Sequence, residues 1–205
     1  TGDCFMQSPF WKTHDSSEQN KLVADLIKIV DSCSSLGIQK LIIPLVDNGR
    51  IEKKAEERLL LKHLLNLSQY LRKKRVQVMF ETDFTPLRNK AFISTLPADI
   101  FGINYDSGNS ASLGYDFIEE FNVYSNLITD IHIKDRLYQG PSVPLGEGNA
   151  KLFNFFNYLI KINYQGLLIF QAFRTDDGPG SLLPQLKYVE KLIDDLETKD
   201  LENEI

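Results

Sequence analysis

Four polar residues follow apolar, strand-like runs along the chain, and their side chains are of types that bind metal ions. They are Glu81, Asp106, His132 and Gln171. Two carboxylates, an imidazole and an amide oxygen form a mixed ligand set that suits Mn²⁺, Mg²⁺, Co²⁺ or Zn²⁺. A single polar residue at a strand end is commonly a loop or capping residue, but four in succession favour a metal or substrate site. Asp83, two residues beyond the first of them, either orients that carboxylate or caps the following helix.

Further polar residues close to these positions are candidates for binding a substrate. Asn109 either hydrogen-bonds a sugar hydroxyl or serves in a tight turn. Lys134 and Arg136 carry charges that suit an anionic group such as a sugar phosphate, although Lys134 alternatively pairs with a neighbouring carboxylate. Arg174 is a second candidate for binding an anion.

These residues would be positioned by short apolar runs that alternate with longer amphipathic segments. The expected helices span about 16–35, 52–74, 86–95, 114–125, 150–163 and 181–197. The expected strands are Cys4–Gln7, Lys40–Leu45, Val76–Glu81, Phe101–Tyr105, Ile128–Ile133 and Leu167–Gln171. Regular alternation with nearly continuous apolar strands predicts parallel strands covered by helices. Because the carboxyl ends of parallel strands share one side of the fold, the strand-end residues are expected to converge there.

Two architectures fit this alternation, an open doubly wound sheet or a closed barrel. No glycine-rich nucleotide loop follows any of the strands, which disfavours the open dinucleotide-binding sheet. A complete (β/α)8 barrel usually needs about 250 residues, whereas the chain has 205. We therefore expect one domain, 1–205, with a TIM-barrel-like (β/α) repeat of about six of the eight units and the N-terminal units missing. The Gly- and Pro-containing segment Tyr138–Asn149 is expected to be an active-site loop.

The overall composition narrows the class of partner. The formal net charge of −5 gives no general attraction to nucleic acid. No apolar run is long enough to cross a membrane. The two cysteines, Cys4 and Cys33, form no CxxC pair or disulfide framework, which predicts a reducing compartment and a cytoplasmic protein.

Three motifs, in this order and spacing, resemble the xylose-isomerase-like TIM barrels, in particular their sugar phosphate isomerase/epimerase branch. They are Asp106-Ser107-Gly108-Asn109, His132-Ile133-Lys134-Asp135-Arg136 and Val143-Pro144-Leu145-Gly146-Glu147-Gly148-Asn149. The opening Asp3–Met6 also resembles the third-strand region of such barrels, and Ile43–Leu45 resembles the fourth. The DNA-repair endonucleases of the same superfamily use many histidines to hold three zinc ions, and this chain has three histidines.

The resemblance implies that Glu81, Asp106 and His132 are metal ligands. The family's fourth ligand is a Glu on the last strand, where this chain has Gln171. Such an ion acidifies a sugar C–H and stabilises an enediolate, while carboxylates move the proton. Gln171 cannot act as a base and brings no charge, so weaker metal binding is expected. Glu81 remains as the catalytic carboxylate, with Glu147 or Asp83 as helpers.

The sequence thus predicts a metal-dependent sugar or sugar-phosphate isomerase or epimerase that acts through an enediolate. The alternative is a catalytically inactive barrel remnant that binds sugar or a protein partner. The substrate-binding candidates are Asn109, Lys134, Arg136, Glu147 and Arg174. A homo-oligomer that covers the incomplete edge of the barrel is a further expectation.

Overall fold

Five parallel strands alternate with helices along the chain in the computed structural model of the protein, which describes residues 2–171, 173 and 175–203. The strands are Lys40–Leu45 (β1), Gln77–Thr82 (β2), Phe101–Asp106 (β3), Ile128–Ile133 (β4) and Leu167–Phe170 (β7). They form one sheet in the order β1-β2-β3-β4-β7. Each strand therefore pairs with its predecessor along the chain, as in a β/α repeat, and the predicted α/β class is confirmed.

The expected first strand, Cys4–Gln7, is wrong, because this segment is the short helix α1 (Cys4–Gln7). The amides of Met6 and Gln7 donate to the carbonyl of Asp3, so they are used within the turn. Gly2 donates to the carbonyl of Ile42 at 2.7 Å, and no ladder forms beyond it within residues 2–171. The repeat accordingly has five strands in its main sheet and not six.

The helices fill the intervals between the strands, as expected, with one addition. They are α2 (Ser16–Ser35), α3 (Lys54–Lys74), α4 (Pro86–Ile93), α5 (Ser107–Leu113), α6 (Phe117–Tyr124), α7 (Leu152–Lys161) and α8 (Leu182–Asn203). Short 3₁₀ turns lie at Asp47–Gly49, Ser125–Leu127 and Gly178–Ser181. Helix α5 was expected as a turn, and it forms because the carboxylate of Asp106 caps it by accepting from Asn109 N at 2.7 Å.

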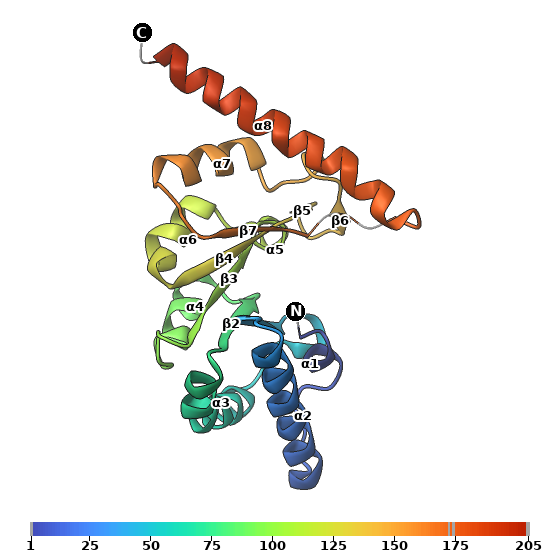
Figure 1. Ribbon diagram of the computed structural model, residues 1–205, viewed down its shortest axis with the longest axis vertical. Coiled ribbons are helices and arrows are strands. Elements are labelled where there is room, and N and C mark those ends of the chain that lie inside the picture. The colour runs from blue at the N-terminus through green and yellow to red at the C-terminus, as the bar shows by residue number, and fades with distance from the viewer. Residues whose placement is uncertain (1, 172, 174, 204–205) are drawn as a thin grey trace. The chain divides into compact units, whose positions relative to one another are not determined.

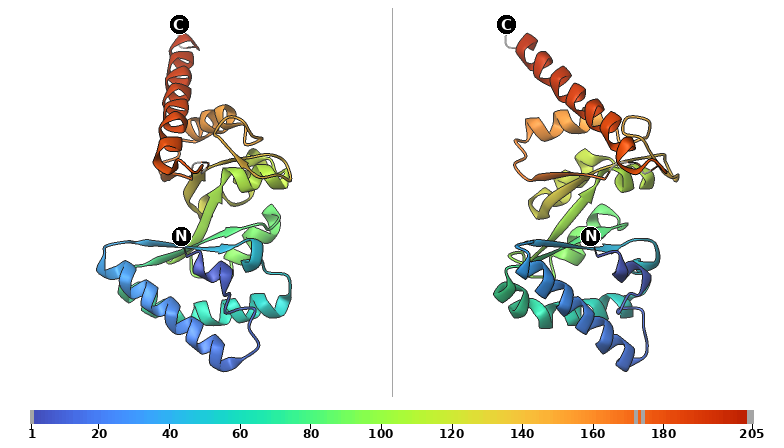
Figure 2. Two further views of the ribbon diagram at one scale, coloured as in Figure 1. Left: turned by 90° about the vertical axis from the view of Figure 1, so that its right-hand side faces the viewer. Right: turned by 45° about the vertical axis from the view of Figure 1, so that its right-hand side comes forward.

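The chain divides into two compact parts, the first of which comprises Thr1–Asn104 and Val123–Thr129. In this part β1 and β2 pair in register from Lys40↔Gln77 to Leu45↔Thr82. Helices α2 and α3 lie on the same side of these strands (Figures 1 and 2). Trp11 is buried there and donates from Nε1 to the carbonyl of Gly49 at 3.0 Å.

The second part comprises Tyr105–Asn122 and Asp130–Ile205. Here β4 and β7 pair in parallel, with His132 opposite Ile169. Aromatic rings from β3, α6 and α7 pack edge to face, with Tyr105 and Phe155 each in contact with Phe121. Helix α8 packs on α7 (Figure 1). The prediction of a single domain over 1–205 remains a prediction.

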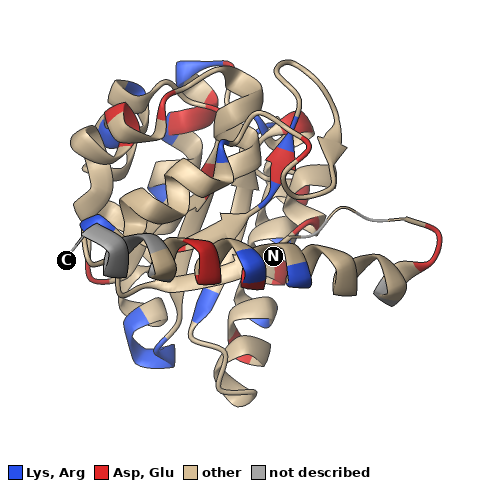
Figure 3. Ribbon diagram, turned by 90° about the horizontal axis from the view of Figure 1, so that it is seen from above, with Lys and Arg blue, Asp and Glu red and all other residues tan. Residues whose placement is uncertain are grey.

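Strand β7 lies at one end of the sheet order, and its apolar side chains are exposed. Leu167, Leu168 and Ile169 have exposed fractions of 59%, 40% and 37%. Acidic and basic residues are interspersed along α8 (Figure 3). In the described part of the chain, no helix is both long enough and apolar enough to cross a membrane.

Candidate metal centre

Asp106 ends β3, and its two carboxylate oxygens have different surroundings. Oδ1 accepts the capping hydrogen bond from Asn109 N. Oδ2 is buried and makes no hydrogen bond within the described residues. It lies 4.0 Å from Nδ1 of His132 and 3.8 Å from Nζ of Lys134. The helix cap therefore fixes the carboxylate while one oxygen stays available as a ligand.

His132 is buried on β4, and its Nδ1 likewise has no hydrogen-bond partner among the described residues. Burial lowers the pKa of His132, and this effect outweighs the carboxylates of Asp106 and Asp130, which raise it. The imidazole is thus neutral near pH 7, and its contact with Asp106 places two ligand atoms side by side. The neutral imidazole is the form that binds metal ions.

Gln171 directly follows β7 and is tied to the neighbouring strand. Its backbone N donates to the carbonyl of Ile133 at 3.0 Å. Its Oε1 is a third buried atom without a hydrogen-bond partner in the described chain. Buried polar atoms are nearly always satisfied in native proteins, so unsatisfied ligand atoms on Asp106, His132 and Gln171 indicate a site for a bound group.

Glu81 is buried in β2, opposite Pro44 of β1. Glu81, Asp106 and His132 are all buried, and each offers a side-chain atom of a type that could hold a metal ion. Carboxylate oxygens and a neutral imidazole nitrogen are ligands for Mg²⁺, Mn²⁺, Co²⁺ and Zn²⁺. The residues present therefore fit a divalent ion.

The backbone of Lys134 is clamped by the first turn of α5. Ser107 Oγ donates to the carbonyl of Lys134 at 2.7 Å and accepts from its amide at 3.0 Å. A Cβ at Gly108 would lie 2.7 Å from Cγ of Lys134, so the glycine leaves room for the lysine stem. Of the two alternatives for Lys134, the structure places its ammonium beside a carboxylate, that of Asp106.

Arg136 and Asn109, both candidates for binding substrate, contact each other. Nη1 of Arg136 donates to Oδ1 of Asn109 at 2.8 Å. Nε and Nη2 donate to the carbonyl of Gly140, at 3.2 and 2.9 Å. The guanidinium therefore ties α5 to the following loop, and binding of substrate by either side chain remains a prediction.

The loop after β4 is organised by a residue whose role the sequence did not reveal. It contains a small antiparallel hairpin, β5 (Asp135–Arg136) with β6 (Ser142–Val143). The buried carboxylate of Asp135 accepts from the amides of Gly146, Gly148 and Ala150 at 2.9 to 3.0 Å. The one signal in the sequence for this role of Asp135 was its position as a carboxylate directly before a Gly-rich loop.

The remaining candidates lie elsewhere or outside the described residues. Glu147 is on the loop held by Asp135 and is exposed. Asp83 forms an ion pair with Arg50, which neither alternative for it anticipated. Arg174 lies outside the residues that the structure describes.

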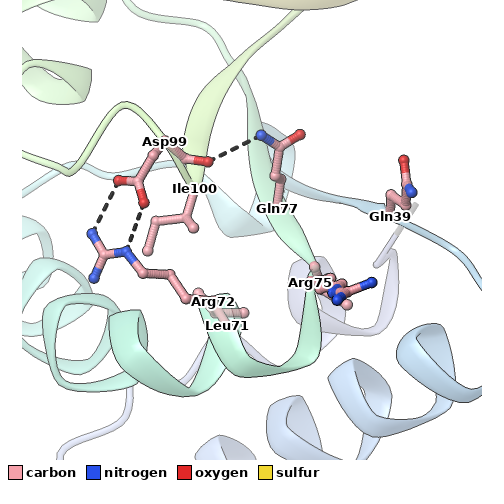
Figure 4. A pocket seen from close by; sticks show the side chains of 8 residues that line it. Gln39, Leu71, Arg72, Arg75, Gln77, Asp99 and Ile100 are labelled. Atoms are coloured by element: carbon pink, nitrogen blue, oxygen red, sulfur yellow. Dashed lines mark hydrogen bonds and ion pairs between the residues drawn. The ribbon is translucent and has the colours of Figure 1, made fainter.

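A separate pocket of about 360 Å³ lies at the amino ends of β2 and β3 (Figure 4). Arg72 donates there from Nε and Nη2 to the carboxylate of Asp99, at 2.6 and 3.0 Å. Gln77 donates to the carbonyl of Asp99 at 3.1 Å. In β/α barrels this side of the fold serves stability and the opposite side carries the chemistry, so we assign these contacts a structural role.

The chain belongs to the xylose isomerase-like TIM barrel family, whose sequence profile matches residues 4–194. This confirms the resemblance seen in the three motifs. Comparison with curated protein sequences gives no match.

Several solved structures share this fold, and some of them are named as sugar isomerases or epimerases. A xylose isomerase domain protein from Planctomyces limnophilus superposes with a TM-score of 0.74 at 20% identity, over 89% of this chain and 69% of that one. The IOLI protein, solved with a zinc atom, gives 0.72 at 18% identity, over 93% and 74%. An L-ribulose 3-epimerase gives 0.71 at 15% identity, over 94% and 74%. At these identities the likeness establishes the fold.

Proposed function

We propose that the chain binds a divalent metal ion through Glu81, Asp106 and His132, with Oε1 of Gln171 as a further oxygen ligand. The observation that carries this proposal is the set of buried ligand atoms without hydrogen bonds on Asp106, His132 and Gln171. Two of these residues, Asp106 and His132, also belong with Glu81 to a group of buried side chains that could hold a metal ion, which adds support. The zinc atom in the IOLI protein is consistent with such a centre.

The reaction proposed for this centre is isomerisation or epimerisation of a ketose or ketose phosphate. When bound, the ion would supply positive charge that polarises a carbonyl and the adjacent hydroxyl of the sugar. Glu81 is proposed as the carboxylate that takes up and returns the proton of the carbon between them. Gln171 holds no proton at neutral pH that it can exchange in this way, so a one-base route follows. Asn109, Lys134, Arg136, Glu147 and Arg174 are proposed to contact the substrate.

A second candidate function is that of a non-catalytic relative that binds sugar or a protein. The observation that favours it is the amide of Gln171, which removes one carboxylate from the strand-end group. The two functions differ in whether the carbon-bound protons next to the carbonyl of a bound sugar exchange with solvent.

The test combines metal binding with proton exchange. Titration calorimetry with Mn²⁺ and Co²⁺ should show one site per chain in the wild type and none in Asp106→Asn or His132→Ala, whereas the exposed Asp176→Asn serves as a matched control. Incubation with ketoses and ketose phosphates in D₂O should then incorporate deuterium next to the carbonyl carbon, detected by mass spectrometry. Metal binding without any exchange would support the non-catalytic function, and an absence of metal binding would refute the centre itself.

The exposed apolar side chains of β7 also support the expectation of a homo-oligomer. Light scattering coupled to size-exclusion chromatography tests it, since a monomer at all concentrations would contradict it.

A further inference from the structure

The ammonium group of Lys134 lies close enough to one of the proposed metal ligands to affect the binding of an ion directly. Nζ is 3.8 Å from Oδ2 of Asp106, which is the free ligand oxygen of that carboxylate. The exposed fractions of the two side chains are 16% for Lys134 and 1% for Asp106. Solvent therefore screens this pair little, and a fixed positive charge lies beside one of the ligands.

The position of this charge is built into the fold. Ser107 clamps both backbone polar groups of Lys134, and Gly108 leaves space for the stem of its side chain. Both residues belong to the first turn of α5, which Asp106 itself caps.

The positive charge of Lys134 matters because the four proposed metal ligands carry little negative charge. Glu81 and Asp106 bring two negative charges, whereas Gln171 and neutral His132 bring none. The ammonium of Lys134 offsets one of the two negative charges. A divalent ion at Oδ2 of Asp106 must therefore approach a fixed positive charge, which weakens its binding.

We propose that Lys134 restrains metal binding at this centre. In the free protein its ammonium supplies the positive charge beside Asp106 that a bound ion would otherwise supply, and so it weakens binding of the ion. This inference rests on the proposed metal centre and adds a regulatory element to it. Divalent ions consequently bind the free protein weakly. A ligand group with negative charge, which draws the ammonium toward itself, strengthens metal binding.

The experiment compares Mn²⁺ affinities of the wild type, Lys134→Met and Lys134→Arg by titration calorimetry in a buffer that does not bind metal. Methionine keeps most of the stem and removes the charge, while arginine keeps the charge. Lys134→Met should bind Mn²⁺ at least about tenfold more tightly than the wild type, equivalent to about 1.4 kcal/mol. Lys134→Arg should stay within about threefold of the wild type, or about 0.7 kcal/mol. Circular dichroism spectra should show that all three proteins are folded.

The possible outcomes separate this inference from the function on which it rests. Tighter binding of Mn²⁺ by Lys134→Met than by the wild type supports the restraint. Equal or weaker binding in Lys134→Met, with a wild type that binds Mn²⁺, overturns the restraint and leaves the metal centre intact. No binding by any of the three proteins overturns both. Tight binding by Lys134→Arg, equal to that of Lys134→Met, also overturns the role of the charge.

Discussion

Arg136 donates from Nη1 to Oδ1 of Asn109 at 2.8 Å, so two residues that each suggested substrate binding are partners of one another. The same guanidinium donates twice to the carbonyl of Gly140. It therefore joins the first turns of α5 to the loop that follows β4. Arginine suits this role because its rigid planar fork presents donors in fixed directions to two acceptors, whereas lysine has one compact ammonium on a flexible stem.

Replacement of Arg136 by lysine should destabilise the fold through this connection. We expect the free energy of unfolding in urea to fall by about 1 to 3 kcal/mol, since hydrogen bonds from a charged group are lost. Asn109→Ala should cost less, and the double variant should be less destabilised than the sum of the two. Strictly additive effects would show that the two side chains do not interact in solution.

Replacement of Asp135 by alanine should loosen the loop at Gly146–Ala150, because three buried or half-buried amides lose their acceptor. The expected loss of unfolding free energy is about 2 to 4 kcal/mol, by the cost of unsatisfied donors. Hydrogen exchange at Gly146, Gly148 and Ala150 should accelerate. Asp176→Ala, on the exposed surface, is the matched control and should change neither quantity. Unchanged exchange in Asp135→Ala would refute the role of this carboxylate.

A methyl group at Gly102 should overpack the interior of the first part of the chain. An added Cβ would overlap Cγ2 of Thr129 and lie 3.0 Å from Sδ of Met79. Gly102→Ala should therefore lower the free energy of unfolding by about 1 to 3 kcal/mol. Thr129→Ser removes the overlapping methyl and keeps the hydroxyl, so it should restore part of the loss in the double variant. No restoration would place the strain elsewhere.

Gln171→Glu should have opposite effects on stability with and without metal. Without metal, a new carboxylate in a buried acidic group should lower the melting temperature. With Mn²⁺, the added charge should tighten binding by about tenfold or more and raise the melting temperature above that of the loaded wild type. Thermal unfolding with and without Mn²⁺ measures both signs. A fall in both conditions would argue against an ion close to residue 171.

The raised pKa of Tyr164 predicts that the folded protein loses stability at alkaline pH. Burial, followed by the charge of Asp130, raises the pKa of Tyr164 to about 12, whereas that of an unfolded tyrosine is about 10. The unfolded chain therefore releases this proton first, and the contribution to stability is complete below pH ~10 and lost as the pH rises to ~12. Tyr164→Phe should make the melting temperature less dependent on pH in this window. Parallel curves for both proteins would contradict the shift in pKa.

The residues of the proposed metal centre could be predicted from the sequence because of a simple pattern. A polar residue after an apolar run marks a strand end, and parallel strands bring such ends to one side of the fold. Asp106 and His132 come together in this way. The pattern could not reveal how the residues are held, since the cap on α5 and the clamp by Ser107 depend on backbone groups.

Other features were missed for identifiable physical reasons. Cys4–Gln7 has the composition of a strand, but its amides are used within a turn. Helix α5 consists mostly of serine, glycine and asparagine, which carry no helical periodicity, and its start depends on one carboxylate. The loop at Asp135 is shaped by backbone amides, for which side-chain patterns give no signal.

Asp135 holds its loop through backbone amides, so the shape of the loop depends little on most of its side chains. The constrained groups are the amides of Gly146, Gly148 and Ala150, which donate to Asp135. Side chains are also excluded at Gly146, where a Cβ would lie 2.5 Å from Cζ of Tyr188, and at Gly148, where it would lie 2.7 Å from the carbonyl oxygen of Arg136. The exposed position 147 between them is not constrained in this way. Exchanging the side chain at position 147 alone could therefore select new ligand preferences, because the backbone of the loop would keep its conformation.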